Sequence, residues 1–361
     1  MSHLDFTLAV HRAVAPGPHA QVCWSPFSVA SALGLLAIGA GGASRAELVG
    51  LLGDLDELAD LLARAGRPAA GTAEEEPVVA VSNTLWADAS ITIRDSFAAR
   101  LGGWSGGQVR NAPFGAEPEK ARDEINADVR QTTRQLIPEL LPPGAITAET
   151  VAALVNALYL RCGWRHRFTD GATEPMPFHT PTGTVRVPTM ALSERVGYAA
   201  ADGWQIVSLP AAGGVEAVVL LPDADIADAE PRLTATSLAG LLAAPRPRSV
   251  SLRLPKLKVG SRAELTGPLR ALGVRTVFTD HADLQAISPD RLSVDQIVHQ
   301  SVLKLDEQGL EGAAATAIMM RLLSASRDDP LPVLVDRPFL LVIRHANAKA
   351  VYFLARVTDP S

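Results

Sequence analysis

The sequence predicts an α+β protein that folds as a single domain over residues 1–361. Strand-like runs with alternating or continuous apolar residues are interspersed with capped, amphipathic helical segments in no regular βαβ order. No internal repeat and no linker long enough to split the chain is visible. A hydrophobic content of 47% supplies ample material for one large core.

Composition argues against nucleic-acid binding, a membrane span and a cysteine-based metal site. The net charge of −6 argues against nucleic acid as a partner, and the densest basic cluster, residues 165–167, is too short to line a groove. No apolar run reaches the ~18 residues that a membrane span needs. Residues 1–20 show no signal-peptide pattern, which leaves a cytoplasmic location and secretion after processing both open. Cys23 and Cys162 sit in apolar runs, so we expect buried free thiols and neither a disulfide nor a metal site.

The first third of the chain is predicted to be mainly helical. Ser25 and Pro26 are a favoured cap and first residue for a helix that continues to Gly39. The segment at 55–65 is an acidic helix, and the glycine-, proline- and glutamate-rich residues 66–77 form a surface loop. The expected elements are helices at 3–15, 26–39, 43–52, 55–65 and 95–101, with strands at 21–24 and 78–86.

Residues 103–107, Gly-Trp-Ser-Gly-Gly, formally fit the Gly-x-Ser-x-Gly nucleophile elbow around Ser105. That elbow requires a strand before the serine and a helix after it. Here a helical segment precedes and a polar strand-like segment follows, so a flexible turn is the better interpretation. A serine hydrolase that uses Ser105 stays as a minor alternative.

The middle and end of the chain alternate helices with strands. Residues 151–160 are almost continuously apolar, as in a strand buried on both faces, and Asn156 lies within this run. A buried amide needs hydrogen-bond partners. The other expected elements are helices at 117–135 and 265–272, and strands at 205–209, 216–222, 249–259, 339–345 and 351–357.

The segment from Lys304 to Pro332 has an unusual composition. It starts as the end of a strand, turns at Gln308–Gly309, and continues with small residues from Gly312 to Ala317. Alanine favours helix, but no capping residue stands before Leu310 and glycines weaken the first turn.

As a strand, the same segment separates into two faces. Leu310, Gly312, Ala314, Thr316, Ile318 and Met320 form one face, and Glu311, Ala313, Ala315 and Ala317 form the other. One face suits a core and the other tolerates water. The segment is therefore able to be a loop in one state and a strand in another.

The motif Glu307-Gln308-Gly309-x-Glu311-x-Ala313-Ala314-Ala315-Thr316 closely resembles the hinge of the reactive-centre loop of serpins. Ser25-Pro26-x-Ser28, residues 82–86, Trp164 and Leu254-Pro255-Lys256 also resemble that family, so the resemblance covers nearly the whole chain. It implies the serpin fold, with three β-sheets named A, B and C, eight or nine helices, and an exposed reactive-centre loop at about 307–332. We expect a bacterial, prokaryotic-type member. Arginine supplies most of the positive charge, which fits a GC-rich genome at least as well as it fits heat adaptation.

The resemblance also implies roles for particular residues. The hinge would comprise Glu307, Gln308, Gly309, Leu310, Glu311, Gly312, Ala313, Ala314 and Ala315. The shutter, a cluster beneath the main sheet that gates its opening in serpins, would comprise Ser25, Ser28, Asn156 and His299. Trp164 would lie in the breach, at the top of the same sheet.

By the same resemblance, the protein is a metastable suicide-substrate inhibitor of serine proteases rather than an enzyme. The protease would cleave the loop near Leu323–Ser324, form an acyl complex, and be trapped when the loop inserts into the main sheet. Leu323 implies a chymotrypsin-like or elastase-like target, whereas cleavage after Arg321 would imply a trypsin-like target. We expect a monomer with no cofactor, and no heparin-like activator because the helix at 55–65 is acidic.

Leu310 departs from the family, which usually has threonine or serine at this first inserted position. Its bulk is expected to slow insertion, so Leu310→Thr is expected to raise the fraction of protease that is trapped. A non-inhibitory serpin-like carrier or chaperone is the second alternative. The alanine-rich hinge disfavours it, because such hinges typically carry bulky or charged residues.

Overall fold

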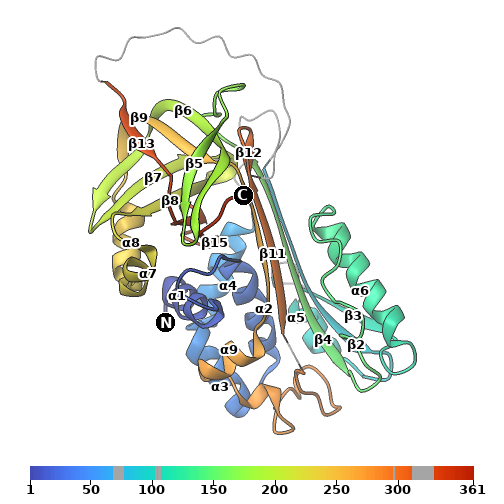
Figure 1. Cartoon of the computed structure of the whole chain (residues 1–361). Coiled ribbons are helices and arrows are strands. Elements are labelled where there is room, and N and C mark those ends of the chain that lie inside the picture. Colours follow the sequence, from blue (N-terminus) through green and yellow to red (C-terminus); the bar gives the residue numbers. More distant parts are fainter. Residues whose placement is uncertain (68–76, 102–103, 105–106, 296, 311–328) are drawn as a thin grey trace.

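The computed structural model describes the whole chain except residues 68–76, 102–103, 105–106, 296 and 311–328 (Figure 1). Two β-sheets pack against each other, and most of the helices surround one end of this sandwich. The helices in the described part are α1 (His3–Val14), α2 (Pro26–Gly39), α3 (Gly42–Leu52), α4 (Leu55–Ala65), α5 (Asp95–Leu101), α6 (Pro118–Thr132), α7 (Ile226–Ala229), α8 (Ala235–Ala243) and α9 (Thr266–Ala271).

The larger sheet has nine strands in the order β1-β15-β14-β8-β7-β6-β9-β13, with β5 also paired to β6. These strands are β1 (Val22–Trp24), β5 (Glu174–Thr180), β6 (Gly183–Ala201), β7 (Trp204–Pro210), β8 (Val215–Pro222), β9 (Arg246–Pro255), β13 (Leu331–Leu334), β14 (Phe339–His345) and β15 (Val351–Val357). The long strand β6 pairs with β5 and β9 and then with β7, so sheets B and C are hydrogen-bonded into one.

The second sheet corresponds to the expected main sheet A and has six strands in the order β10-β11-β12-β4-β2-β3. They are β2 (Val78–Asp88), β3 (Gly107–Ala112), β4 (Ala152–Gly163), β10 (Leu257–Glu264), β11 (Val298–Leu305) and β12 (Gly309–Leu310). Along β11, buried and half-buried residues alternate, because one face of the strand lies in the core. Helix α6 covers the opposite face through Ile125 and Val129 (Figure 1).

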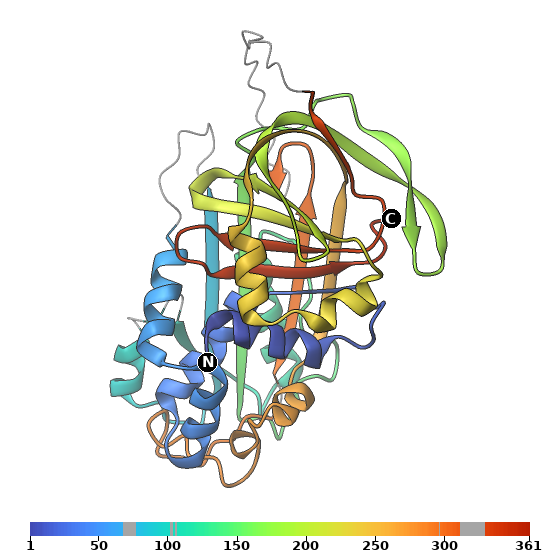
Figure 2. The same cartoon turned by 90° about the vertical axis from the view of Figure 1, so that its left-hand side faces the viewer.

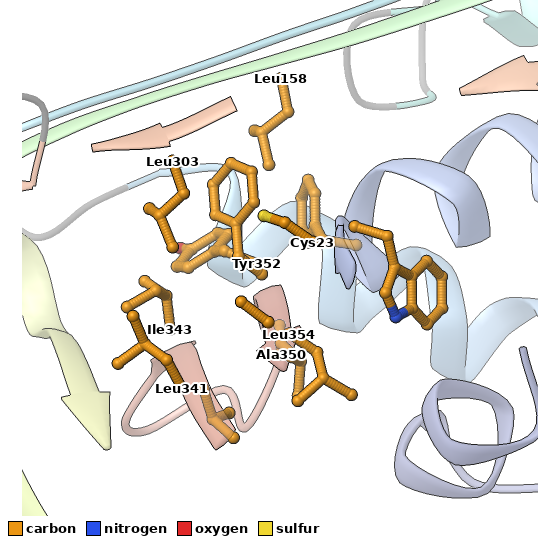
Figure 3. Packing of buried hydrophobic residues seen from close by; sticks show 14 of the residues in the cluster. Cys23, Leu158, Leu303, Leu341, Ile343, Ala350, Tyr352 and Leu354 are labelled. Atoms are coloured by element: carbon orange, nitrogen blue, oxygen red, sulfur yellow. The ribbon is translucent and has the colours of Figure 1, made fainter. Parts of the chain in front are cut away.

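The main core lies between the two sheets. Figure 3 shows Leu158 and Leu303 of the six-stranded sheet near Leu341, Ile343, Tyr352 and Leu354 of the nine-stranded sheet. Cys23 and Cys162 are free and buried, as expected, and burial raises the pKa of each thiol to about 12. No helix of the described residues has the length and apolar character needed to cross a bilayer.

Three sequence predictions were wrong in detail. The strand expected at 249–259 is two strands in different sheets, because the chain pairs with β6 as far as Pro255 and then pairs with β11 from Leu257 onward. The helix expected at 117–135 ends at Thr132, since Arg134 and Gln135 have positive φ angles of 48° and 70°. The expected loop at 307–332 contains β12 at one end and the start of β13 at the other.

Candidate functional site

The site begins where β11 turns into β12 (Figure 1). The carboxylate of Asp306 accepts hydrogen bonds from the backbone N–H groups of Gln308 and Gly309, at 2.9 and 3.2 Å. The amide of Asp306 in turn donates to Gly309 O at 3.0 Å. This tight turn directs Gly309 and Leu310 back between β11 and β4.

Gly309 occupies a position that excludes a side chain. It pairs with Gly163 of β4, and a Cβ added to it would lie 2.3 Å from Cys162 O and 2.8 Å from Gly163 Cα. Both neighbours are backbone atoms that cannot rotate away. Glycine is therefore required for β12 to lie between the two strands.

Leu310 pairs with Leu305 of β11 on one side and with Cys162 of β4 on the other. Its side chain is fully buried and belongs to the main core. The bulk of leucine, which we expected to slow insertion, is thus accommodated between β11 and β4 in this structure. The effect of Leu310→Thr on trapping stays a prediction.

Below Leu310, β11 and β4 form the two sides of a gap in the six-stranded sheet. β11 pairs with β10 along its whole length, and β4 pairs with β2. Among the described strands, no ladder joins β11 to β4 directly, and the two separate with distance from β12 (Figure 1). A cavity of about 30 Å³ lies at the far end of this gap, where Val155 and Val298 face Leu141 and Ile146 of the α6–β4 connection.

Glu307 anchors the start of the hinge. Its carboxylate forms an ion pair with Lys256 at 2.8 Å and accepts a hydrogen bond from Thr173 Oγ1 at 2.5 Å. Burial would raise the pKa of Glu307, but these two partners outweigh it and hold the pKa below its usual range. The carboxylate is therefore ionised at neutral pH, and it ties the hinge to the β9–β10 junction.

Residues 164–170 hold the same turn from the other side. The indole N–H of Trp164 donates to Asp306 O at 2.8 Å, and the backbone N–H groups of Trp164 and Phe168 donate to Gln308 O and Glu307 O. Asp170 accepts from Gln308 Nε2 at 3.1 Å. The structure thus places Trp164 at the top of the six-stranded sheet, where the breach was expected.

The residues expected to form the shutter lie in the buried part of the structure. The Ser25 hydroxyl caps α2 by accepting the Ser28 N–H at 3.1 Å, and the Ser25 N–H donates to His299 Nε2 at 3.1 Å. His299 therefore accepts as a neutral ring, and burial lowers its pKa to about 4. Asn156 donates to Asn83 on the neighbouring strand β2.

Sequence reasoning missed the partners of Asn156. Asn83 is fully buried and donates to Ser31 Oγ at 2.8 Å, and Ser31 O accepts from the indole of Trp104 at 2.9 Å. Asn83 lies inside the predicted strand at 78–86, just as Asn156 lies inside the strand predicted at 151–160. A second amide within an apolar strand was the sequence signal that could have identified Asn83 as a partner. Lys256 and Thr173 were also missed as partners of Glu307, because nothing in the local sequence relates them.

Several predicted residues lie outside the described residues: Glu311, Gly312, Ala313, Ala314, Ala315, Arg321, Leu323, Ser324 and Ser105. Around Ser105, α5 precedes and β3 follows, which is not the strand–turn–helix order of a nucleophile elbow. In the described part of the chain, no group of three His, Cys, Asp or Glu side chains is placed to hold a metal ion.

Comparisons with known proteins agree with this geometry. The family model "Serpin (serine protease inhibitor)" matches residues 1–360. Iripin-2 from Ixodes ricinus is 30% identical over 98% of this chain and 91% of its own length. Serpin A3-5 from Bos taurus is 31% identical over 100% of this chain and 89% of its own, and Serpin-Z2A from Triticum aestivum is 30% identical over 94% and 90%.

Solved structures show the same fold. A complex of thyroxine-binding globulin with thyroxine has a TM-score of 0.87 at 21% identity, and uncleaved ovalbumin has a TM-score of 0.86 at 23% identity. Each alignment covers 99% of this chain and 98% of the other. The relatives named above come from a tick, cattle and wheat, so they do not support the expected bacterial origin. The family match across the chain and the serpin relatives together show that this protein belongs to the serpin family, whose members are typically protease inhibitors.

Proposed function

We propose that this chain inhibits a serine protease with an apolar primary pocket by a suicide-substrate mechanism. The protease cleaves near Leu323–Ser324 and remains as an ester on Leu323. The cleaved loop then inserts into the gap between β11 and β4 and carries the protease with it. The observation that supports this proposal is the position of Gly309 and Leu310. These two residues pair with β4, and Leu310 also pairs with β11, at the end of the gap that the inserted loop would occupy.

The free energy for insertion comes from two sources. Each new ladder hydrogen bond contributes about 0.5–1.5 kcal/mol, and each large apolar side chain that becomes buried contributes about 1.5–3 kcal/mol. With Leu310 facing the core, strand alternation points Gly312, Ala314, Thr316 and Ile318 to the same side. These side chains are small or apolar, so the strand can continue without burying a charge.

The direct test mixes the protein with chymotrypsin and looks for a band at the summed mass that survives boiling in detergent. Ala314→Glu is expected to abolish this band, because a carboxylate would enter the core, and the protein would instead be cleaved as a substrate. The matched control, Ala313→Glu, places the same charge on the opposite face and should still form the band. Absence of the band with wild-type protein and active protease would contradict the proposal.

The choice of cleavage site has its own test. Leu323→Arg is expected to shift inhibition from chymotrypsin to trypsin. Wild-type inhibition of trypsin would instead select Arg321 as the cleaved residue.

The protease assay, together with thermal unfolding of the cut protein and an esterase assay, separates the alternative functions. One neighbour in fold is described as a complex of thyroxine-binding globulin with thyroxine, so a carrier role is the second candidate. A carrier would give no stable band with any protease and no gain in thermal stability after the loop is cut. A serine hydrolase would hydrolyse an ester and lose this activity in Ser105→Ala.

A further inference from the structure

Two histidines hold the turn between β14 and β15, and the inhibitory mechanism uses neither of them. The amide of Val351 donates to His3 Nε2 on α1 at 3.1 Å. The amide of Ala348, within the same turn, donates to Nδ1 of His345 at 3.0 Å. A ring nitrogen that accepts a hydrogen bond carries no proton, so both bonds need that nitrogen to be unprotonated.

The surroundings of both rings oppose protonation. His345 is 7% exposed, and burial together with the positive charge of Arg64 on α4 lowers its pKa. The His3 ring stacks on Phe6, with centroids 6.3 Å apart, and burial lowers the pKa of His3 to about 4. The proton therefore binds more readily when the turn is open.

The charged groups around the two rings do not stabilise the protonated form of either histidine. Arg64 is paired with Asp60 at 3.0 Å, and Lys349 in the turn adds another positive charge. Asp5, on the same helix as His3, is engaged by the N–H and hydroxyl of Ser2. Among the described ion pairs, none joins a carboxylate to His3 or His345, whereas His11 and His19 each contact one.

We propose that His3 forms an acid-sensitive junction between α1 and the β14–β15 turn, and that His345 forms an acid-sensitive bond within that turn. Protonation of His3 removes the acceptor of the Val351 N–H, and protonation of His345 at Nδ1 removes that of the Ala348 N–H. Loss of the His3 bond lets the start of α1 separate from the turn, and loss of the His345 bond loosens the turn itself. Figure 2 shows α1 lying beneath β14 and β15, and separation of its first turn would expose Phe6. The device is independent of loop insertion and of any protease.

The sign and size of the effect follow from linkage. Stability from His3 is complete above its ordinary pKa of 6.5 and is lost as the pH falls toward 4. Between about pH 7.5 and about pH 5, the opening equilibrium should increase roughly 30-fold through His3 alone. Amide hydrogen exchange at Val351 and Ala348, corrected for the intrinsic rate, measures this opening directly.

One variant for each histidine replaces the imidazole ring by an amide oxygen, which accepts a hydrogen bond but does not titrate. In His3→Gln, Oε1 can replace Nε2, and in His345→Asn, Oδ1 can replace Nδ1. His3→Gln should remove the pH dependence of opening measured at the Val351 amide, and His345→Asn should remove that measured at the Ala348 amide. The control His281→Gln changes a side chain that is 86% exposed and should leave both dependences intact.

Two results would overturn the proposal. The first is unchanged protection of the Val351 and Ala348 amides in acid. The second is an equal loss at Val207 and Val219, which pair at the centre of the larger sheet, because this would show that the opening is global. The comparison of turn and sheet amides needs only wild-type protein, so it decides the question even if a variant fails to fold.

Discussion

The substitution Gly309→Ala tests whether β12 is held between β11 and β4 as the structure indicates. The added methyl group would lie 2.3 Å from Cys162 O, far inside contact distance, so β12 must leave its place or the strands must separate. The matched control is Gly163→Ala on the facing strand. There a Cβ would meet Gln308 O at 3.6 Å, which is ordinary contact.

The expected loss of stability is estimated from the contacts that β12 loses when it leaves the sheet. Exposure of the fully buried Leu310 costs about 1.5–3 kcal/mol, and the loss of two or three ladder hydrogen bonds costs about 1 kcal/mol each. The total is about 3.5–6 kcal/mol, which lowers the population in which β12 lies between β11 and β4 by roughly three to four powers of ten. Gly163→Ala should change stability by less than about 1 kcal/mol.

Three measurements check this prediction. Urea denaturation gives the loss of stability. The fluorescence of Trp164, which contacts the backbone of the same turn, should shift to the red when β12 leaves. In the protease assay, Gly309→Ala should lower the fraction trapped, because the inserted strand begins at this residue. Equal denaturation midpoints and equal trapping for Gly309→Ala and Gly163→Ala would refute the reasoning.

Further predictions concern the groups around the hinge and under the sheet. Glu307→Lys replaces the ion pair with Lys256 by repulsion and should lower the unfolding free energy by about 2 kcal/mol in urea, between the values for exposed and buried pairs. Glu174→Lys, which breaks a more exposed pair, should cost less than about 1 kcal/mol, and equal losses would contradict the anchoring role of Glu307. Burial lowers the pKa of His299 from 6.5 to about 4, so the stability it contributes is complete above pH 6.5 and is lost toward pH 4, by up to about 3 kcal/mol. Denaturation midpoints across this range should fall less in His299→Gln than in wild type. Asn83→Ala removes its hydrogen bonds to the buried network and should cost about 1–3 kcal/mol at all pH values, whereas an unchanged midpoint would show that the network adds nothing.

Local sequence was sufficient for many of the elements. Ser25 and Pro26 mark the start of α2 because capping involves only residues within one turn of each other. The buried and half-buried residues of β11 alternate for an equally local reason, since side chains point to opposite sides of a strand in turn. The motif that begins at Glu307 suggested the serpin family by resemblance, and the family match confirms that family. The hinge role of its residues stays a prediction.

Only the tertiary structure decided which residues meet across the chain. The ion pair of Glu307 with Lys256, and the bond of Asn156 to Asn83, join segments that are far apart in sequence. The position of β12 likewise depends on the width of the gap between β11 and β4. The physical reason is that helix caps and strand faces are set by near neighbours. Hydrogen-bond partners and strand order depend on how separate elements pack, and no local pattern records that packing.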